Sequence, residues 1–491
     1  MRGLTPAGQA TKLKLSPSEM GTAWPDYQFG VSVPRYFASR PSVLPPLSIP
    51  AALASPVFGR VFDTMAAPLA ELGELQRESE CAMELCLLMP KSFAVESERQ
   101  EAFLDALSRF LDVRVDGFSP TVGWTSRSDG GIQAQIFGLL IMLLLIELKN
   151  ELSLGGGEPT FQSLRFAELR FEVPALAALR DADSCPALLL EVLGPHLRVS
   201  ALAWMPSGHV LCEPLTPLLH VLPLTGQPRQ LDDLVRVLAA LRRALEELHE
   251  HYTRTVARLP PAAATAKLPT IAADAAAAAN SWLALPYPLQ DDAVFENVTH
   301  LSPGKLLYDA TWVAAGARVC VKFAPRAYAA EVHAAWAADG LAPELLEHRV
   351  LPGGIHMIVM ELLSPEDGWC MLGEVGARPG GGGFIAAERA AALAAALAAL
   401  QRAHTLTLSC GRRAAHGDCR DANIMVRRAD AGAFEVRFLD FDWAGPADEA
   451  RYPPYMSDAV TWPSGAAPGA PIMQAHEAEL LMWSMSKAVP S

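Results

Sequence analysis

The chain has 491 residues, is 51% hydrophobic and carries a formal net charge of -14 at pH 7. This length predicts two or three globular domains with full hydrophobic cores. The negative charge disfavours a protein that works mainly by binding nucleic acid, because phosphate backbones are held by Lys and Arg.

The N-terminal residues 1–60 are rich in Pro, Ser and Ala, which is typical of a loosely held or disordered segment. The first residues contain no apolar run of the kind that secretory signals carry. The eight cysteines of the chain include no C-x-x-C pair, which indicates separate reduced thiols. We therefore expect an intracellular protein, in the cytoplasm or the nucleus.

Residues 61–225 alternate between helical and strand-like patterns. Helical patterns cover 62–88, 96–113 and 159–172, and strand-like runs cover 121–137, 139–152, 185–205 and 209–223. This order predicts a mixed α/β domain built on a mixed sheet. The apolar run 132–148 is short for a bilayer and holds polar residues, so we interpret it as buried strands and expect no membrane partner.

Charged residues lie at the ends of two of these strands. Glu147 and Lys149 end an apolar strand, and alternation along the strand places both on the same side. Asp129 opens the preceding strand, and Gln162 lies near the start of the next helix. Two carboxylates can hold Mg²⁺, and a nearby lysine can activate water or stabilise developing charge.

This pattern resembles the D…E-x-K core of the PD-(D/E)XK nuclease-like fold, which implies metal-dependent phosphodiester hydrolysis at the four residues just named. Under this resemblance, Glu98 or Glu101 of the first helix fits as a further ligand. Two other interpretations stay open. E-x-K occurs by chance in many proteins, so these residues can be a solvated strand end, or the domain can be degenerate and serve for interaction.

Residues 226–290 begin with a long amphipathic helical pattern, in which leucines recur at helical spacing. The Pro- and Ala-rich run 260–280 follows and is typical of a linker. We expect this segment to connect two domains.

Residues 291–491 contain the groups that phosphoryl transfer needs, and these groups follow one another along the chain in the required order. Lys322 lies on a β-branched strand, and Glu331 on the following helix is placed to pair with it. The stretch HGDCRDAN places Asp418 five residues before Asn423, and Asp440 ends a later apolar run. Such a reaction requires a cation on the phosphates, oxygen ligands for Mg²⁺ and a carboxylate that orients the attacking hydroxyl.

H-G-D-x-x-x-x-N followed by F-L-D-F-D resembles the protein-kinase-like superfamily, which includes protein kinases and aminoglycoside phosphotransferases. The resemblance implies ATP and Mg²⁺ as cofactors and a two-lobed fold. By position, Lys322 would hold the α- and β-phosphates, Glu331 would orient Lys322, and Asp418 would be the base. Asn423 and Asp440 would bind Mg²⁺. His416 would brace the loop.

Several residues depart from the family pattern. Gly417 resembles small-molecule phosphotransferases, whereas Arg420 stands where protein kinases carry a catalytic lysine, so the hydroxyl acceptor stays open between a small molecule and a protein. Gly304 is the single glycine where a glycine-rich phosphate loop is expected. About fifty residues follow Asp440, which predicts a reduced C-lobe. A pseudokinase or scaffold is therefore an alternative.

A nuclease-like domain ahead of a kinase-like domain resembles multidomain proteins of mushroom-forming fungi and Crinkler-type effectors. We thus expect a multidomain α/β and α+β protein: a mixed-sheet nuclease-like domain, a helical linker, and a kinase-like domain. The expected activity is ATP- and Mg²⁺-dependent phosphoryl transfer to a hydroxyl. The alternative is a metal-dependent nuclease, for which nucleic acid would be the partner.

Overall fold

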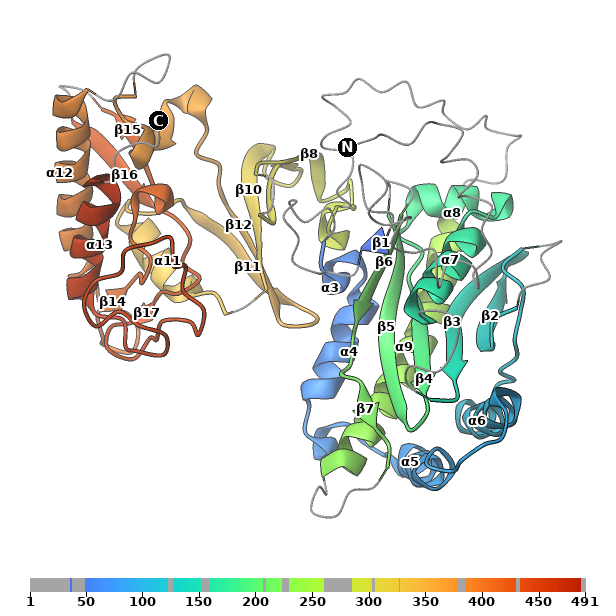
Figure 1. Ribbon diagram of the computed structural model, residues 1–491. Coiled ribbons are helices and arrows are strands. Elements are labelled where there is room, and N and C mark those ends of the chain that lie inside the picture. The colour runs from blue at the N-terminus through green and yellow to red at the C-terminus, as the bar shows by residue number, and fades with distance from the viewer. Residues whose placement is uncertain are drawn as a thin grey trace, which may run out of the picture. The chain divides into compact units, whose positions relative to one another are not determined.

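The computed structural model describes residues 36–37, 49–121, 127–151, 159–205, 209–222, 229–259, 285–302, 305–325, 327–377, 385–429 and 433–486. The chain divides into two compact units, Met1–Gln290 and Asp291–Ser491. Both units combine helices with sheets, so the protein is a mixed α+β protein with several sheets (Figure 1). No helix in the described ranges has both the length and the apolar character needed to cross a bilayer.

The first unit is built on one sheet with the strand order β1-β6-β5-β4-β3-β2, and β7 pairs with β5. The strands are β1 (Tyr36–Phe37), β2 (Gly130–Ile136), β3 (Leu139–Lys149), β4 (Ala187–Leu193), β5 (His196–Met205), β6 (His209–Pro214) and β7 (Leu219–His220). The pairs β3–β4 and β1–β6 are parallel and the others are antiparallel, so the sheet is mixed. The buried strands expected in the run 132–148 are confirmed as β2 and β3.

Helices cover both faces of this sheet. They are α3 (Ala51–Ala54), α4 (Pro56–Ala66), α5 (Gln76–Leu88), α6 (Glu96–Leu111), α7 (Pro159–Phe171), α8 (Ala177–Ala182) and α9 (Arg229–Arg258), with 3₁₀ turns η1 (Leu69–Glu71), η2 (Pro174–Leu176) and η3 (Tyr287–Leu289). Helix α7 connects the parallel strands β3 and β4, which cannot be joined by a tight turn. It lies in front of the sheet in Figure 1, and α9 lies behind it.

Three expectations about this unit are corrected. Residues 51–60 belong to the helices α3 and α4, most of whose residues are buried, instead of a loose segment. The single helical pattern 62–88 is two helices, because Pro68 and Gly73, which has a φ of 80°, interrupt it. Helix α9 is part of the unit instead of a linker: its apolar stripe is buried against α4 and α5.

The second unit begins with an antiparallel sheet of order β11-β12-β10-β9-β8. Its strands are β8 (Phe295–His300), β9 (Leu307–Trp312), β10 (Ala317–Ala324), β11 (Leu345–Leu351) and β12 (Ile355–Glu361). Helix α11 (Ala330–Ala338) follows the central strand β10. The strand expected around Lys322 is therefore confirmed as β10.

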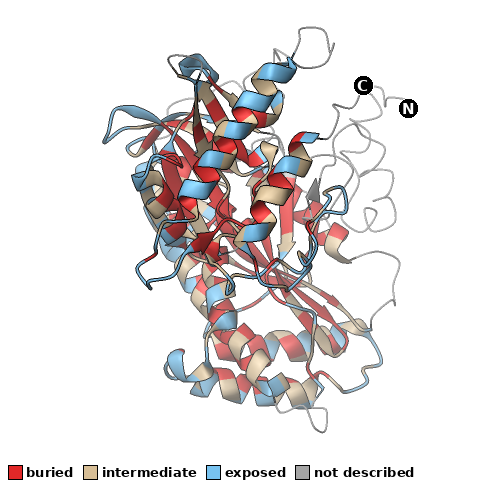
Figure 2. Ribbon diagram, turned by 90° about the vertical axis from the view of Figure 1, so that its left-hand side faces the viewer, coloured by how far each residue is buried: buried red, intermediate tan, exposed pale blue. Residues whose placement is uncertain are grey.

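The rest of this unit is helical and has two small sheets. Its elements are η4 (Pro365–Asp367), β13 (Trp369–Met371), η5 (Leu372–Glu374), α12 (Ala386–Ala403), β14 (Ala414–Ala415), η6 (Asp421–Asn423), β15 (Ile424–Arg428), β16 (Phe434–Phe438), β17 (Gly445–Pro446) and α13 (Gln474–Ser486). One core joins Trp336 of α11, Phe438 of β16 and Leu481 of α13. Figure 2 shows the resulting pattern, with buried residues on the inner sides of the long helices and exposed ones outside.

Candidate functional site

Lys322 lies in the middle of the central strand β10 of the second unit. Val319, Val321 and Phe323 point to one face of the sheet, so Lys322 points to the other. Its Nζ donates hydrogen bonds to Asp440 and, at 2.5 Å, to Oδ1 of Asp442. Burial alone would lower the pKa of Lys322, but attraction from the two carboxylates is larger and raises it. Lys322 is therefore protonated at neutral pH.

Two carboxylates thus face one ammonium group. Burial opposes ionisation of Asp440, but the charge of Lys322 prevails and lowers the pKa of Asp440. Burial raises the pKa of Asp442, and the attraction of Lys322 only partly offsets this. The group as a whole has more carboxylate than one ammonium neutralises, an arrangement that favours an additional cation.

Asp440 has a left-handed backbone conformation, with a φ of 69°. A non-glycine residue there costs roughly 1–2 kcal/mol, so the surroundings must hold it. His416 does so: its Nε2 lies 2.7 Å from the carbonyl oxygen of Leu439, and its Nδ1 lies 3.3 Å from the backbone N of Asp418. Because the carbonyl can only accept and the N–H can only donate, the proton of His416 is on Nε2. His416 therefore joins the Asp418 loop to Asp440.

Asp418 is nearly buried and accepts several hydrogen bonds. Arg420 donates to both of its oxygens, at 2.7 and 3.0 Å, and Nδ2 of Asn423 donates to Oδ2 at 2.7 Å. The same Nδ2 contacts the backbone oxygen of Asp418. Among the described residues, the amide oxygen of Asn423 accepts no hydrogen bond, which leaves it available to a cation.

The loop is also held by Glu477 of α13, which the sequence analysis did not identify. Its Oε1 accepts hydrogen bonds from the backbone N–H groups of His416 and Gly417, and its Oε2 contacts His404. Glu477 is 1% exposed. A lone acidic residue in QAHEAELL gives no signal of this role, because the pairing spans sixty residues of sequence.

Two further residues, Glu331 and Gly304, are assigned from the kinase-like resemblance. Glu331 does not pair with Lys322, which is a correction: its Oε1 accepts a hydrogen bond from the backbone N of Ser409 at 2.6 Å, on the exposed side of α11. Val332, His333 and Trp336 bury the other side of that helix, which turns Glu331 outward. Gly304 lies outside the described residues.

A second charged cluster lies at the end of β3 in the first unit. Nζ of Lys149 lies 2.8 Å from Glu147, 3.7 Å from Glu96 and 3.9 Å from Asp129. Oδ2 of Asp129 also accepts a hydrogen bond from the backbone N of Leu148 at 2.7 Å. The structure therefore brings Asp129, Glu147 and Lys149 together, as the sequence pattern predicts.

Burial in this cluster disfavours the ionised forms of Asp129 and Glu147. Burial, followed by repulsion from Asp129, raises the pKa of Glu147 to about 8 despite the contact with Lys149. Burial likewise raises the pKa of Asp129. Within the described ranges, no group of three or more His, Cys, Asp or Glu side chains that could hold a metal ion is found, either at this cluster or around Lys322.

One further expectation about this cluster is corrected. The helix residue beside Lys149 is Glu96, the first residue of α6, whereas Glu98 accepts a hydrogen bond from the backbone N of Ala94 and Glu101 is exposed. Gln162 has no hydrogen bond to the cluster among the described residues. Its neighbour Thr160 instead donates to Glu191 at 2.7 Å.

Among solved structures, the chain is similar to the structure of vaccinia related kinase 3, at 14% sequence identity and a TM-score of 0.29. The match covers 39% of this chain and 62% of that chain, so the chain spans less than two thirds of that kinase. No family model matches the sequence, and no curated protein matches it. A function for this chain is therefore inferred from the residues of the two sites.

Proposed function

We propose that the second unit transfers the γ-phosphoryl group of ATP to a hydroxyl of a protein or a small molecule, with Mg²⁺ as cofactor. One observation carries the proposal: His416 joins the Lys322–Asp440 pair to the loop that holds Asp418 and Asn423. These groups come from separate segments, and their types are those that phosphoryl transfer uses.

The residues present fit a nucleotide with its metal ion. Asp440 has a carboxylate in an environment with excess negative charge, and Asn423 has an amide oxygen free of hydrogen bonds, so both would hold Mg²⁺. Bound Mg²⁺ would neutralise phosphate charge and orient the transferred group. Lys322 would bind the phosphates as a buried cation.

Asp418 would orient the acceptor hydroxyl and accept its proton. An ionised carboxylate has about four acceptor positions, and Arg420 and Asn423 occupy three of those of Asp418. The remaining position can accept the hydroxyl. Arg420 fixes the carboxylate through two parallel bonds, which limits its rotation.

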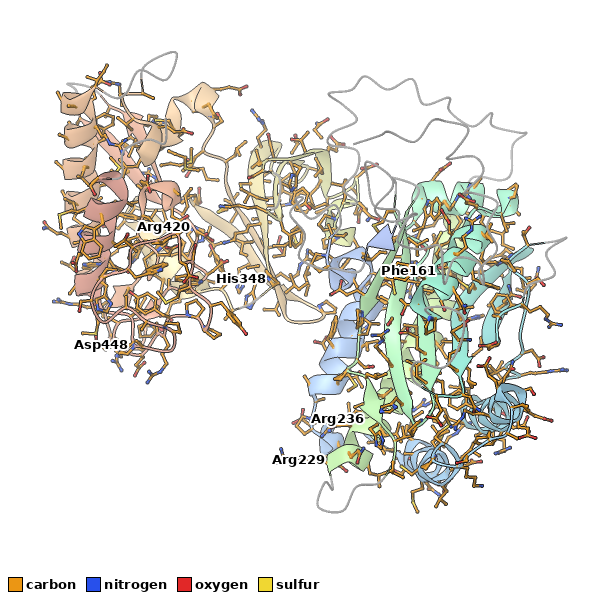
Figure 3. All side chains as sticks on the ribbon, viewed as in Figure 1. Phe161, Arg229, Arg236, His348, Arg420 and Asp448 are labelled. Carbon is orange, nitrogen blue, oxygen red and sulfur yellow. The ribbon has the colours of Figure 1, made fainter. Side chains whose placement is uncertain are left out.

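The test is thermal unfolding of the protein with and without ATP and Mg²⁺. A ligand that binds only the folded state, at about a hundred times its dissociation constant, adds about 2.7 kcal/mol of stability. We expect a shift that requires Mg²⁺ and disappears in Asp440→Asn. Asp448→Asn is the matched control, because Asp448 also has a positive φ, of 70°, and lies well away from Arg420 in Figure 3.

If millimolar ATP produces no shift in the wild-type protein, the phosphotransferase proposal is wrong. The pseudokinase or scaffold alternative then becomes the better account of this unit. If the shift occurs and both variants lose it, the metal role of Asp440 is not supported.

A second candidate function concerns the first unit: metal-dependent hydrolysis of a phosphodiester at Asp129, Glu147 and Lys149. The observation in its favour is that Asp129 and Glu147 both lie beside Lys149, and that burial, followed by repulsion from Asp129, raises the pKa of Glu147 to about 8. A divalent cation would favour the ionised carboxylates there. The assay is nicking of plasmid DNA in Mn²⁺ or Mg²⁺, with Lys149→Ala as the inactive variant. Nicking that persists in Lys149→Ala contradicts this candidate.

A further inference from the structure

Lys322 has two carboxylate partners, and only one of them matches a metal-binding position. Asp440 and Asp442 flank Phe441, whose ring is buried and stacks on His333 with a centroid distance of 4.7 Å and an interplanar angle of 9°. Because Phe441 is anchored in the core, both aspartates are carried to the side where Lys322 lies. The position of Asp442 is therefore determined by packing.

A divalent cation and the ammonium group of Lys322 compete for Asp440. If Asp440 were the sole partner, binding of the cation would leave a largely buried ammonium group without a carboxylate, which is costly. Lys322 is 14% exposed, so water replaces the lost partner poorly. The carboxylate expected from α11 does not help, because Glu331 contacts Ser409.

We propose that Asp442 is the positioning residue that keeps Lys322 in place when Asp440 binds the metal ion, the role that the sequence pattern assigns to Glu331. This inference rests on the proposed phosphotransferase function. Its basis is the contact of 2.5 Å between Nζ of Lys322 and Oδ1 of Asp442. The ring of Tyr328, 5.4 Å from Nζ, adds a weaker attraction on the same ammonium group.

The experiment measures the Mg²⁺ concentration that gives half of the ATP-induced thermal shift. In Asp442→Asn, Lys322 depends on Asp440 alone, so more Mg²⁺ is needed to displace it. We expect this concentration to rise about tenfold or more, because hydrogen bonds to charged groups are worth more than neutral ones. Asp442→Glu, which keeps the charge, should restore a value close to that of the wild-type protein.

Glu331→Gln is the matched control, since it neutralises the alternative partner. We expect it to leave the half-saturating Mg²⁺ concentration unchanged. A purely structural role for Asp442 would lower the unfolding temperature of the free protein in Asp442→Asn but would not move this concentration. An unchanged concentration in Asp442→Asn, or a raised one in Glu331→Gln, overturns the proposal.

The outcomes separate this inference from the function on which it rests. If the wild-type protein shows no Mg²⁺-dependent shift with ATP, both the phosphotransferase proposal and the role of Asp442 are wrong. If the wild-type protein shifts and Asp442→Asn behaves like it, only the role of Asp442 falls. Should Asp442→Asn fail to fold, Asp442→Glu and Glu331→Gln still decide: only a near wild-type concentration in both supports the proposal.

Discussion

Single residues in both units lie where neighbouring charges are only partly balanced. Around Lys322, two aspartates share one ammonium group, and around Lys149, Glu96, Asp129 and Glu147 share another. Such groups weaken folding when their charges are unmatched, and they are common where a charged ligand binds. Substitution of these residues should therefore change the free energy of unfolding of the protein without ligand.

The pH dependence of stability tests the cluster at Lys149. The pKa of Glu147 is raised from 4.5 to about 8 in the folded protein, so its contribution to stability is present below about pH 4.5 and is lost as the pH rises through about 8. Glu147→Gln removes this titration. The free energy of unfolding of Glu147→Gln relative to wild type should then increase by about 4 kcal/mol between about pH 5 and about pH 9.

Urea unfolding at the two pH values measures this difference, and losses that do not depend on pH cancel. Glu101→Gln, on the exposed side of α6, serves as the control and should show no such change. A difference that stays constant with pH would contradict the raised pKa of Glu147.

At the scale of elements, β10 and α13 position the candidate site, and turns between strands affect stability. The two-residue turn between β2 and β3 consists of Phe137 and Gly138, with φ values of 45° and 88°. Two positive φ values are typical of a hairpin turn that prefers Asn-Gly. A phenylalanine in this conformation is strained, and Phe137 is 71% exposed, so little burial compensates.

Phe137→Asn should therefore stabilise the protein by about 1 kcal/mol, since asparagine tolerates a positive φ and the exposed ring contributes little. Chemical unfolding of the variant and of wild type measures this gain. Phe137→Ala provides the comparison, because alanine removes the ring without favouring the turn. A loss of stability in Phe137→Asn would show that the ring makes contacts that outweigh the strain.

At the scale of the whole molecule, the chain forms two compact units, and each buries apolar residues of its own. The first unit contains the cluster at Lys149, and the second contains the site at Lys322. A ligand or a substitution should therefore act mainly on the stability of the unit that contains it.

Calorimetry should resolve two unfolding transitions. Mg²⁺ with ATP is expected to raise the temperature of one of them, and Glu147→Gln at about pH 9 is expected to raise the other. Asp440→Asn should cancel the first effect and leave the second intact. A single transition that shifts as a whole in both experiments would contradict independent folding of the two units.

The sequence by itself determined the main elements and the order of the candidate residues. The apolar run 132–148 favours buried strands over a membrane span, and the Ala and Leu content of 386–403 favours a helix. The spacing of Asp418, Asn423 and Asp440 likewise indicates one site. These features are local, so a single stretch of sequence contains the information.

Only the tertiary structure decided which charges meet. The stretch that forms α11 is rich in alanine on every side, so its pattern does not say which face is buried, and Glu331 faces outward. Asp442, Glu477 and Glu96 reach their partners across many residues of sequence. Contacts of this kind depend on how helices and strands pack, since the rotation of a helix or the end of a strand sets where a side chain points.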